Sequence, residues 1–131
     1  MITADQLVLH GIGDYIIQSN WMAINKTKSI IPAMTHGFVY SLPFISLHPS
    51  YLALFVIFFT HSIIDRYDLA RYVIWVKNQM ITPVPFHDPQ WSICRATGYS
   101  PDVPPFLAVW LKIICDNLIH VIINGLALKY L

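Results

Sequence analysis

Apolar residues in this sequence form four long runs that are separated by polar or proline-rich connections. The runs extend over residues 3–22, 29–47, 50–77 and 102–131. Each is close to or above the roughly 20 residues with which a helix crosses a hydrocarbon core of about 30 Å. Pro32 and Pro43 are expected to limit or kink the second helix, and Asp102 followed by prolines marks the start of the fourth. The pattern predicts four helices.

The composition places these helices in a membrane. Of the 131 residues, 56% are apolar and 11% are charged, whereas about 25% of an ordinary soluble domain is charged. The formal net charge of +1 provides no basic surface for nucleic acid. We therefore predict an all-α fold, a polytopic membrane four-helix bundle that forms a single integral-membrane domain over residues 1–131 and has no nucleic-acid partner.

The distribution of lysine and arginine predicts the orientation, because positive charge accumulates on the cytoplasmic side. One face carries the basic residues of the first and third connections: Lys26, Lys28, Arg71, Lys77 and Arg95. The other face has Lys129 alone. We expect a protein of the bacterial inner membrane, with both termini in the periplasm and loops 23–29 and 78–103 in the cytoplasm. The second of these loops is rich in proline and joins the third and fourth helices.

Three of the predicted helices carry a histidine and an aspartate four residues apart. The pairs are His10 with Asp14, His61 with Asp65, and Asp116 with His120. This spacing places both side chains on one helix face, about 6 Å apart along the axis. The fourth helix runs back through the bundle and has the opposite order of residues. The histidines are therefore expected in one layer and the aspartates in another, nearer the cytoplasm.

Ionisable groups at this depth need a compensating partner, because each costs roughly 2.5 to 3.5 kcal/mol near mid-bilayer. His36 on the second helix can turn toward the same interior. Imidazoles and carboxylates together match a divalent metal of borderline softness. The expected ligands are His10, Asp14, His36, His61, Asp65, Asp116 and His120. We expect one or two zinc ions, with manganese or iron as alternatives. Gln6, Gln18 and Asn124 extend the same polar stripes and are predicted to orient the ligands.

Nearly the whole chain resembles a small integral-membrane family of unknown function found in bacteria, phages and prophages. The matching stretches are HGIGDYIIQSNWMAINKTK at 10–28, TH at 35–36, THSIIDRYDLARYVIWVKN at 60–78, CRATGY at 94–99 and AVWLKIICDNLIHVIING at 108–125. The resemblance implies the membrane class and marks these positions. More loosely, the His/Asp helices are similar to those of membrane-bound metal-dependent hydrolases and, in their HxxxD spacing, to zinc-dependent phospholipase C and P1-type nucleases. This chain has no Glu ligand, and Met1 stands where those enzymes use a Trp ligand, so it departs from their three-zinc pattern.

The leading hypothesis is a membrane-embedded metal-dependent hydrolase that acts on a phosphoester or other ester of a membrane lipid. A metal activates water, Asp65 or Asp14 accepts the proton, and Lys112 stabilises the developing negative charge. The alternatives are an intramembrane proton or metal-ion relay, a non-catalytic phage membrane protein that binds a host partner, and a purely structural polar core. A homodimer is compatible with each.

Overall fold

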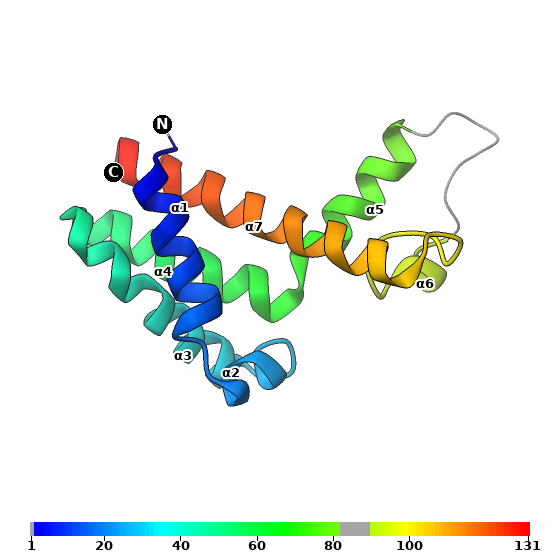
Figure 1. Cartoon of the computed structure of the whole chain (residues 1–131), viewed down its shortest axis with the longest axis horizontal. Coiled ribbons are helices and arrows are strands. Elements are labelled where there is room, and N and C mark those ends of the chain that lie inside the picture. Colours follow the sequence, from blue (N-terminus) through cyan, green and yellow to red (C-terminus); the bar gives the residue numbers. More distant parts are fainter. Residues whose placement is uncertain (1, 82–89) are drawn as a thin grey trace. The chain divides into compact units, whose positions relative to one another are not determined.

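The structure is a computed structural model that describes residues 2–81 and 90–131 (Figure 1). All regular secondary structure in these two ranges is helical, which confirms the all-α prediction for the described part of the chain. The proline-rich loop predicted at 78–103 is only partly covered. Its residues Pro83, Pro85 and Pro89 lie outside the described residues.

Most of the helices are joined directly or by short connections. In chain order they are α1 (Ala4–Gly11), the π-helix η1 (Ile12–Ile16), α2 (Asn20–Asn25), α3 (Ile30–Ser41), the 3-10 helix η2 (Leu42–Leu47), α4 (Tyr51–Tyr67), α5 (Leu69–Ile81), α6 (Trp91–Cys94) and α7 (Pro105–Tyr130). The predicted second and fourth helices correspond to α3 with η2 and to α7. The predicted first and third helices are each divided.

The predicted helix over residues 3–22 is interrupted. A capping box between Thr3 and Gln6 starts α1. The helix then widens, because the amide of Ile17 donates to the carbonyl of Ile12, an i to i+5 bond. The Gln18 side chain donates to the Asp14 carbonyl at 2.8 Å. The interruption is therefore stabilised by hydrogen bonds that the apolar pattern does not reveal.

The predicted helix over residues 50–77 also ends early, at Tyr67. Asp68 has a φ of 50° and stands between α4 and α5. Aspartate tolerates this left-handed conformation better than most residues. Its carboxylate accepts a 2.6 Å hydrogen bond from Lys112, 44 residues away in sequence. The prediction of one continuous helix was wrong, because a partner so distant in the chain leaves no local signal.

The chain divides into two compact units, Met1–Tyr67 with His120–Leu131, and Asp68–Ile119. In the first unit, α3 packs along α4, and η1 and α2 pack against α3. Its apolar core consists of Tyr40, Phe44, Ala53, Ile57 and Ala127. The prediction of a single domain over residues 1–131 stays a prediction.

The second unit has its own tight contact around Gly98. This glycine has a φ of 84°, and a Cβ at this position would overlap the carbonyl of Arg71. Glycine is therefore required where this turn meets α5. On the same unit, the rings of Tyr72 and Trp91 stack with centroids 4.6 Å apart.

Two helical stretches are long and apolar enough to cross a membrane, Ile30–Leu47 and Pro105–Tyr130. They correspond to α3 with η2 and to α7. At 8 and 17 residues, α1 and α4 fall below the roughly 20 residues of a membrane span. The four-span bundle and its orientation therefore stay predictions. The structure contains two helical stretches that could span a membrane.

Candidate metal centre

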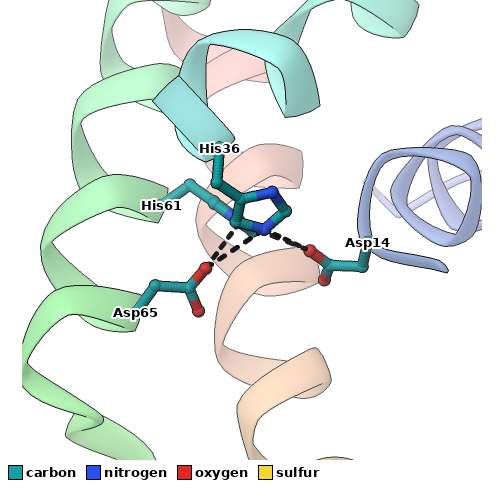
Figure 2. Close-up of side chains that lie close together, drawn as sticks. All are labelled: Asp14, His36, His61 and Asp65. Atoms are coloured by element: carbon teal, nitrogen blue, oxygen red, sulfur yellow. Dashed lines mark hydrogen bonds and ion pairs between the residues drawn. The ribbon is translucent and has the colours of Figure 1, made fainter. Parts of the chain in front are cut away.

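Four of the predicted metal ligands meet inside the first unit. Asp14 comes from η1, His36 from α3, and His61 and Asp65 from successive turns of α4 (Figure 2). All four side chains are buried. Each offers one nitrogen or oxygen atom, and these four atoms lie within 4.8 Å of one another. These buried groups could therefore hold a metal ion.

The distances between the two imidazole nitrogens, and from each of them to the two carboxylate oxygens, are close to those of a tetrahedral site. His36 Nε2 is 3.2 Å from both Asp14 Oδ1 and Asp65 Oδ2. His61 Nε2 is 3.3 Å from Asp14 Oδ1 and 3.1 Å from Asp65 Oδ2. The two Nε2 atoms are 3.0 Å apart. In a tetrahedral zinc site with bonds of about 2.0–2.2 Å, ligand atoms lie about 3.3–3.6 Å apart, so only a small expansion is needed.

The contacts of Asp65 also favour a cation at this place. Asp65 Oδ2 is 3.0–3.2 Å from nitrogen atoms of Lys26, His36 and His61. None of these contacts has hydrogen-bond geometry within the described residues. A buried carboxylate oxygen that faces several nitrogens without hydrogen-bonding to them can either bind a metal ion or accept a proton from a water beside it.

Close approach of α3 and α4 brings His36 and His61 together. Gly37 makes this approach possible, because a Cβ there would overlap Ser62 Oγ and lie 2.8 Å from the carbonyl oxygen of Phe58. Gly37 directly follows His36, and Ser62 directly follows His61. The contact between Gly37 and Ser62 therefore sets the distance between the two imidazoles.

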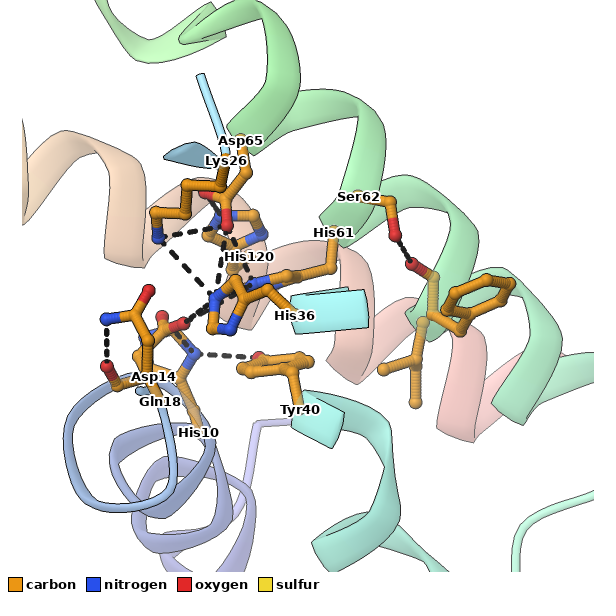
Figure 3. Close-up of polar contacts among 12 residues, drawn as sticks. His10, Asp14, Gln18, Lys26, His36, Tyr40, His61, Ser62, Asp65 and His120 are labelled. Atoms are coloured by element: carbon orange, nitrogen blue, oxygen red, sulfur yellow. Dashed lines mark hydrogen bonds and ion pairs between the residues drawn. The ribbon is translucent and has the colours of Figure 1, made fainter. Parts of the chain in front are cut away.

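Tyr40 supports the site from below (Figure 3). Its ring stacks on His61 at a centroid distance of 3.6 Å and an angle of 16°. Its hydroxyl is 2.7 Å from His10 Nδ1 and accepts a 2.6 Å hydrogen bond from the Asn124 amide. Tyr40 is fully buried. It therefore orients two of the histidines around the cluster.

Lys26 is a cation that lies beside the cluster. Its ammonium is 3.0 Å from Asp65 Oδ2 and 3.5 Å from His36 Nε2. Its side chain is 20% exposed, whereas that of Asp65 is 3% exposed. Lys26 therefore extends from the surface to the buried carboxylate.

Asp14 is ionised despite its burial. Burial raises the pKa of its carboxyl group, but hydrogen bonds with His36 and His61 and the charges of nearby imidazoles act in the opposite direction. The net effect holds the pKa of Asp14 well below its ordinary value. The carboxylate is therefore ready to bind a metal without first losing a proton.

The other predicted ligands have different positions. His10 Nδ1 is 3.5 Å from Asp14 Oδ2, and His120 Nε2 is 3.6 Å from Asp65 Oδ1, so both lie beside the four-residue cluster. Asp116 is one turn before His120 on α7 but belongs to the second unit. The predicted separation into a histidine layer and an aspartate layer is not seen, because His61 Nε2 contacts both Asp14 and Asp65.

Lys112, the predicted anion-stabilising residue, pairs with Asp68 inside the second unit. Of the predicted orienting residues, Asn124 contacts Tyr40, Gln18 binds the backbone of η1, and Gln6 caps α1. Two contributors were missed in the sequence. Tyr40 lies four residues after His36, the same spacing that marked the His/Asp pairs, and so had a usable signal.

Lys26 had no such signal as a site residue, because in the sequence it was interpreted only as one of the basic residues that mark the cytoplasmic side of the membrane.

Comparison with family models, with curated proteins and with solved structures gives no match. The site is therefore interpreted from its own geometry.

Proposed function

We propose that the protein is a membrane-associated zinc hydrolase that cleaves a phosphoester or other ester of a lipid. The observation that carries the proposal is a buried cluster in which two imidazole nitrogens lie 3.0 Å apart and each lies 3.1–3.3 Å from two carboxylate oxygens. This donor set suits zinc, and manganese or iron are the alternatives.

Membrane association is supported by the helices that carry the site. His36 lies in the candidate span Ile30–Leu47, and His120 lies in the candidate span Pro105–Tyr130. Large apolar side chains on these helices are exposed, among them Ile31, Phe38, Phe106 and Trp110. Lipid would cover such surfaces, and a lipid substrate would reach the site from the bilayer. We place the protein in the bacterial inner membrane with both termini in the periplasm.

A catalytic zinc site keeps one position for water, so three protein ligands are enough. We assign Asp14, His36 and His61 as ligands and Asp65 as the general base. Lys26 holds the Asp65 carboxylate at 3.0 Å and thereby positions it. When bound, zinc lowers the pKa of a coordinated water toward about 7 and polarises the ester oxygen.

The chain's own residues then move the proton. Asp65 accepts a proton from the attacking water, whose oxygen forms the new bond to phosphorus. The bond from phosphorus to the leaving alcohol breaks, and the alcohol departs with the proton that Asp65 received.

Two measurements test the proposal. Elemental analysis of protein purified in mild detergent is expected to give about one zinc per chain. Protein in phosphatidylglycerol vesicles is expected to release a hydrolysis product, detected by mass spectrometry, and Asp65→Asn is expected to slow the release about 10²- to 10⁴-fold. Protein that holds no divalent metal, or holds it without turnover, contradicts the hydrolase.

An ion relay is the second candidate, and the continuity of the buried groups favours it. Contacts of 3.0–3.6 Å connect His10, Asp14, His36, His61, Asp65 and His120. Such a row of titratable groups can pass protons or metal ions. In proteoliposomes a relay would move ions without lipid turnover, and that result would favour it over the hydrolase.

A further inference from the structure

Lys26 lies at the end of α2 with its side chain partly exposed. It is the C-cap residue of α2, and its amide donates to the Met22 carbonyl at 2.9 Å. Thr27, the next residue, is bound to α4, because the Arg66 side chain donates a 2.7 Å hydrogen bond to its carbonyl. Arg66 directly follows Asp65 on α4. The turn that carries Lys26 is thus attached to the helix that carries the buried carboxylate.

Within the four-residue cluster of the first unit, the charges leave Lys26 in excess once a metal is bound. Asp14 and Asp65 together balance one divalent cation. The Lys26 ammonium, 3.0 Å from Asp65 Oδ2, is then a surplus positive charge beside the metal. A site with this balance favours an anionic group over a neutral one.

The ammonium also has donors to offer. It carries three N–H groups, and its ion pair with Asp65 Oδ2 does not have hydrogen-bond geometry within the described residues. The contact to His36 Nε2, at 3.5 Å, cannot use the lone pair that this nitrogen would give to a metal. An N–H group of Lys26 therefore becomes available to an oxygen that approaches from the exposed side.

We propose that Lys26 binds the anionic phosphate of the substrate, so that the site selects phosphoesters over uncharged carboxylic esters. This inference rests on the proposed function and names the substrate class of the same site. The phosphate could belong to a lipid headgroup or to a soluble compound, and the chemistry of recognition is the same for both.

The test compares Lys26→Gln with Lys28→Gln, a matched control at an exposed lysine of the same turn. Full-length protein in detergent is loaded with Co²⁺ in place of zinc, and the visible spectrum of the metal reports binding of added inorganic phosphate. Lys26→Gln is expected to weaken phosphate binding about 10- to 100-fold, the loss of one charge-assisted hydrogen bond. Lys28→Gln is expected to bind phosphate as the wild type does.

Lys26→Arg keeps the positive charge and is expected to retain most of the phosphate affinity, which also covers the case in which Lys26→Gln does not fold. A titration with short-chain phosphatidylglycerol distinguishes the sources of phosphate. Dependence on Lys26 for both probes indicates a lipid headgroup, and dependence for inorganic phosphate alone indicates a soluble compound.

The outcomes separate this inference from the proposed function. If the wild-type protein takes up neither cobalt nor zinc, the proposed function fails and this inference fails with it. If metal is bound but phosphate binds equally well to wild type and Lys26→Gln, or does not bind at all, only the role of Lys26 is overturned.

Discussion

The Nε2 atoms of His36 and His61 lie 3.0 Å apart, and both side chains are fully buried. A neutral imidazole has one protonated nitrogen and one lone pair, so two facing Nε2 atoms can share a single proton at most. Both atoms also lie within 3.3 Å of the same two carboxylate oxygens. A metal cation held by both imidazoles would use the lone pair of each Nε2 atom, so removal of one imidazole is expected to weaken metal binding.

Replacing His61 by glutamine is expected to weaken zinc binding by more than about 100-fold, because loss of an outer hydrogen-bond partner alone costs up to about that much. Zinc affinity is measured by competition with a chromophoric chelator. His48→Asn is the control, since His48 is exposed and its φ of 52° is one that asparagine tolerates. Equal zinc affinity in His61→Gln and wild type would show that His61 is not a ligand.

Gly37→Ala is expected to destabilise the protein by about 1–3 kcal/mol, because the added methyl group overlaps Ser62 and forces α3 away from α4. Zinc content is expected to fall in the same variant, since His36 and His61 separate. Gly11→Ala is the control, because a Cβ at Gly11 meets nothing within 4 Å. Chemical denaturation in detergent measures both variants. Normal stability of Gly37→Ala would contradict the close helix contact.

Tyr40→Phe is expected to lower the free energy of unfolding by about 1–3 kcal/mol, because it removes the hydroxyl that contacts Asn124 and His10. The ring remains to stack on His61, so zinc content is expected to stay near that of the wild type. Tyr67→Phe, at an exposed tyrosine, is expected to change stability by less than about 0.5 kcal/mol. A loss of zinc without a loss of stability in Tyr40→Phe would mean that the hydroxyl itself acts at the metal.

Zinc affinity is expected to fall as the pH drops, because protons compete with the metal for the imidazole nitrogens of its histidine ligands. Asp14 does not contribute to this loss, because its pKa lies well below the ordinary value and its carboxylate stays ionised. Calorimetric titrations with zinc in buffers of different ionisation enthalpy measure the protons released on binding. Zinc affinity that is constant from pH 7 to pH 5 would exclude histidine ligands.

Helices and the spacing of residues on one helix face could be predicted from the sequence, because helix geometry depends on residues close together in the chain. The spacing of His61 and Asp65 is one helix turn, and it places both on one face wherever that helix packs. The apolar runs likewise predicted helices, and the described residues of α3, α4 and α7 are helical. The low charge indicated an apolar setting in which the remaining Asp and His residues mark a site.

The sequence by itself therefore determined the helical structure, the low charge of the chain and the residue types of the candidate site. The meeting of Asp14, His36, His61 and Asp65 was decided only by packing, because the close approach of Gly37 to Ser62 sets the register of α3 on α4. Packing also decided which lysine lies beside the cluster. Lys26 reaches Asp65 and Lys112 pairs with Asp68, since an ion pair forms between whichever charges the folded chain brings together.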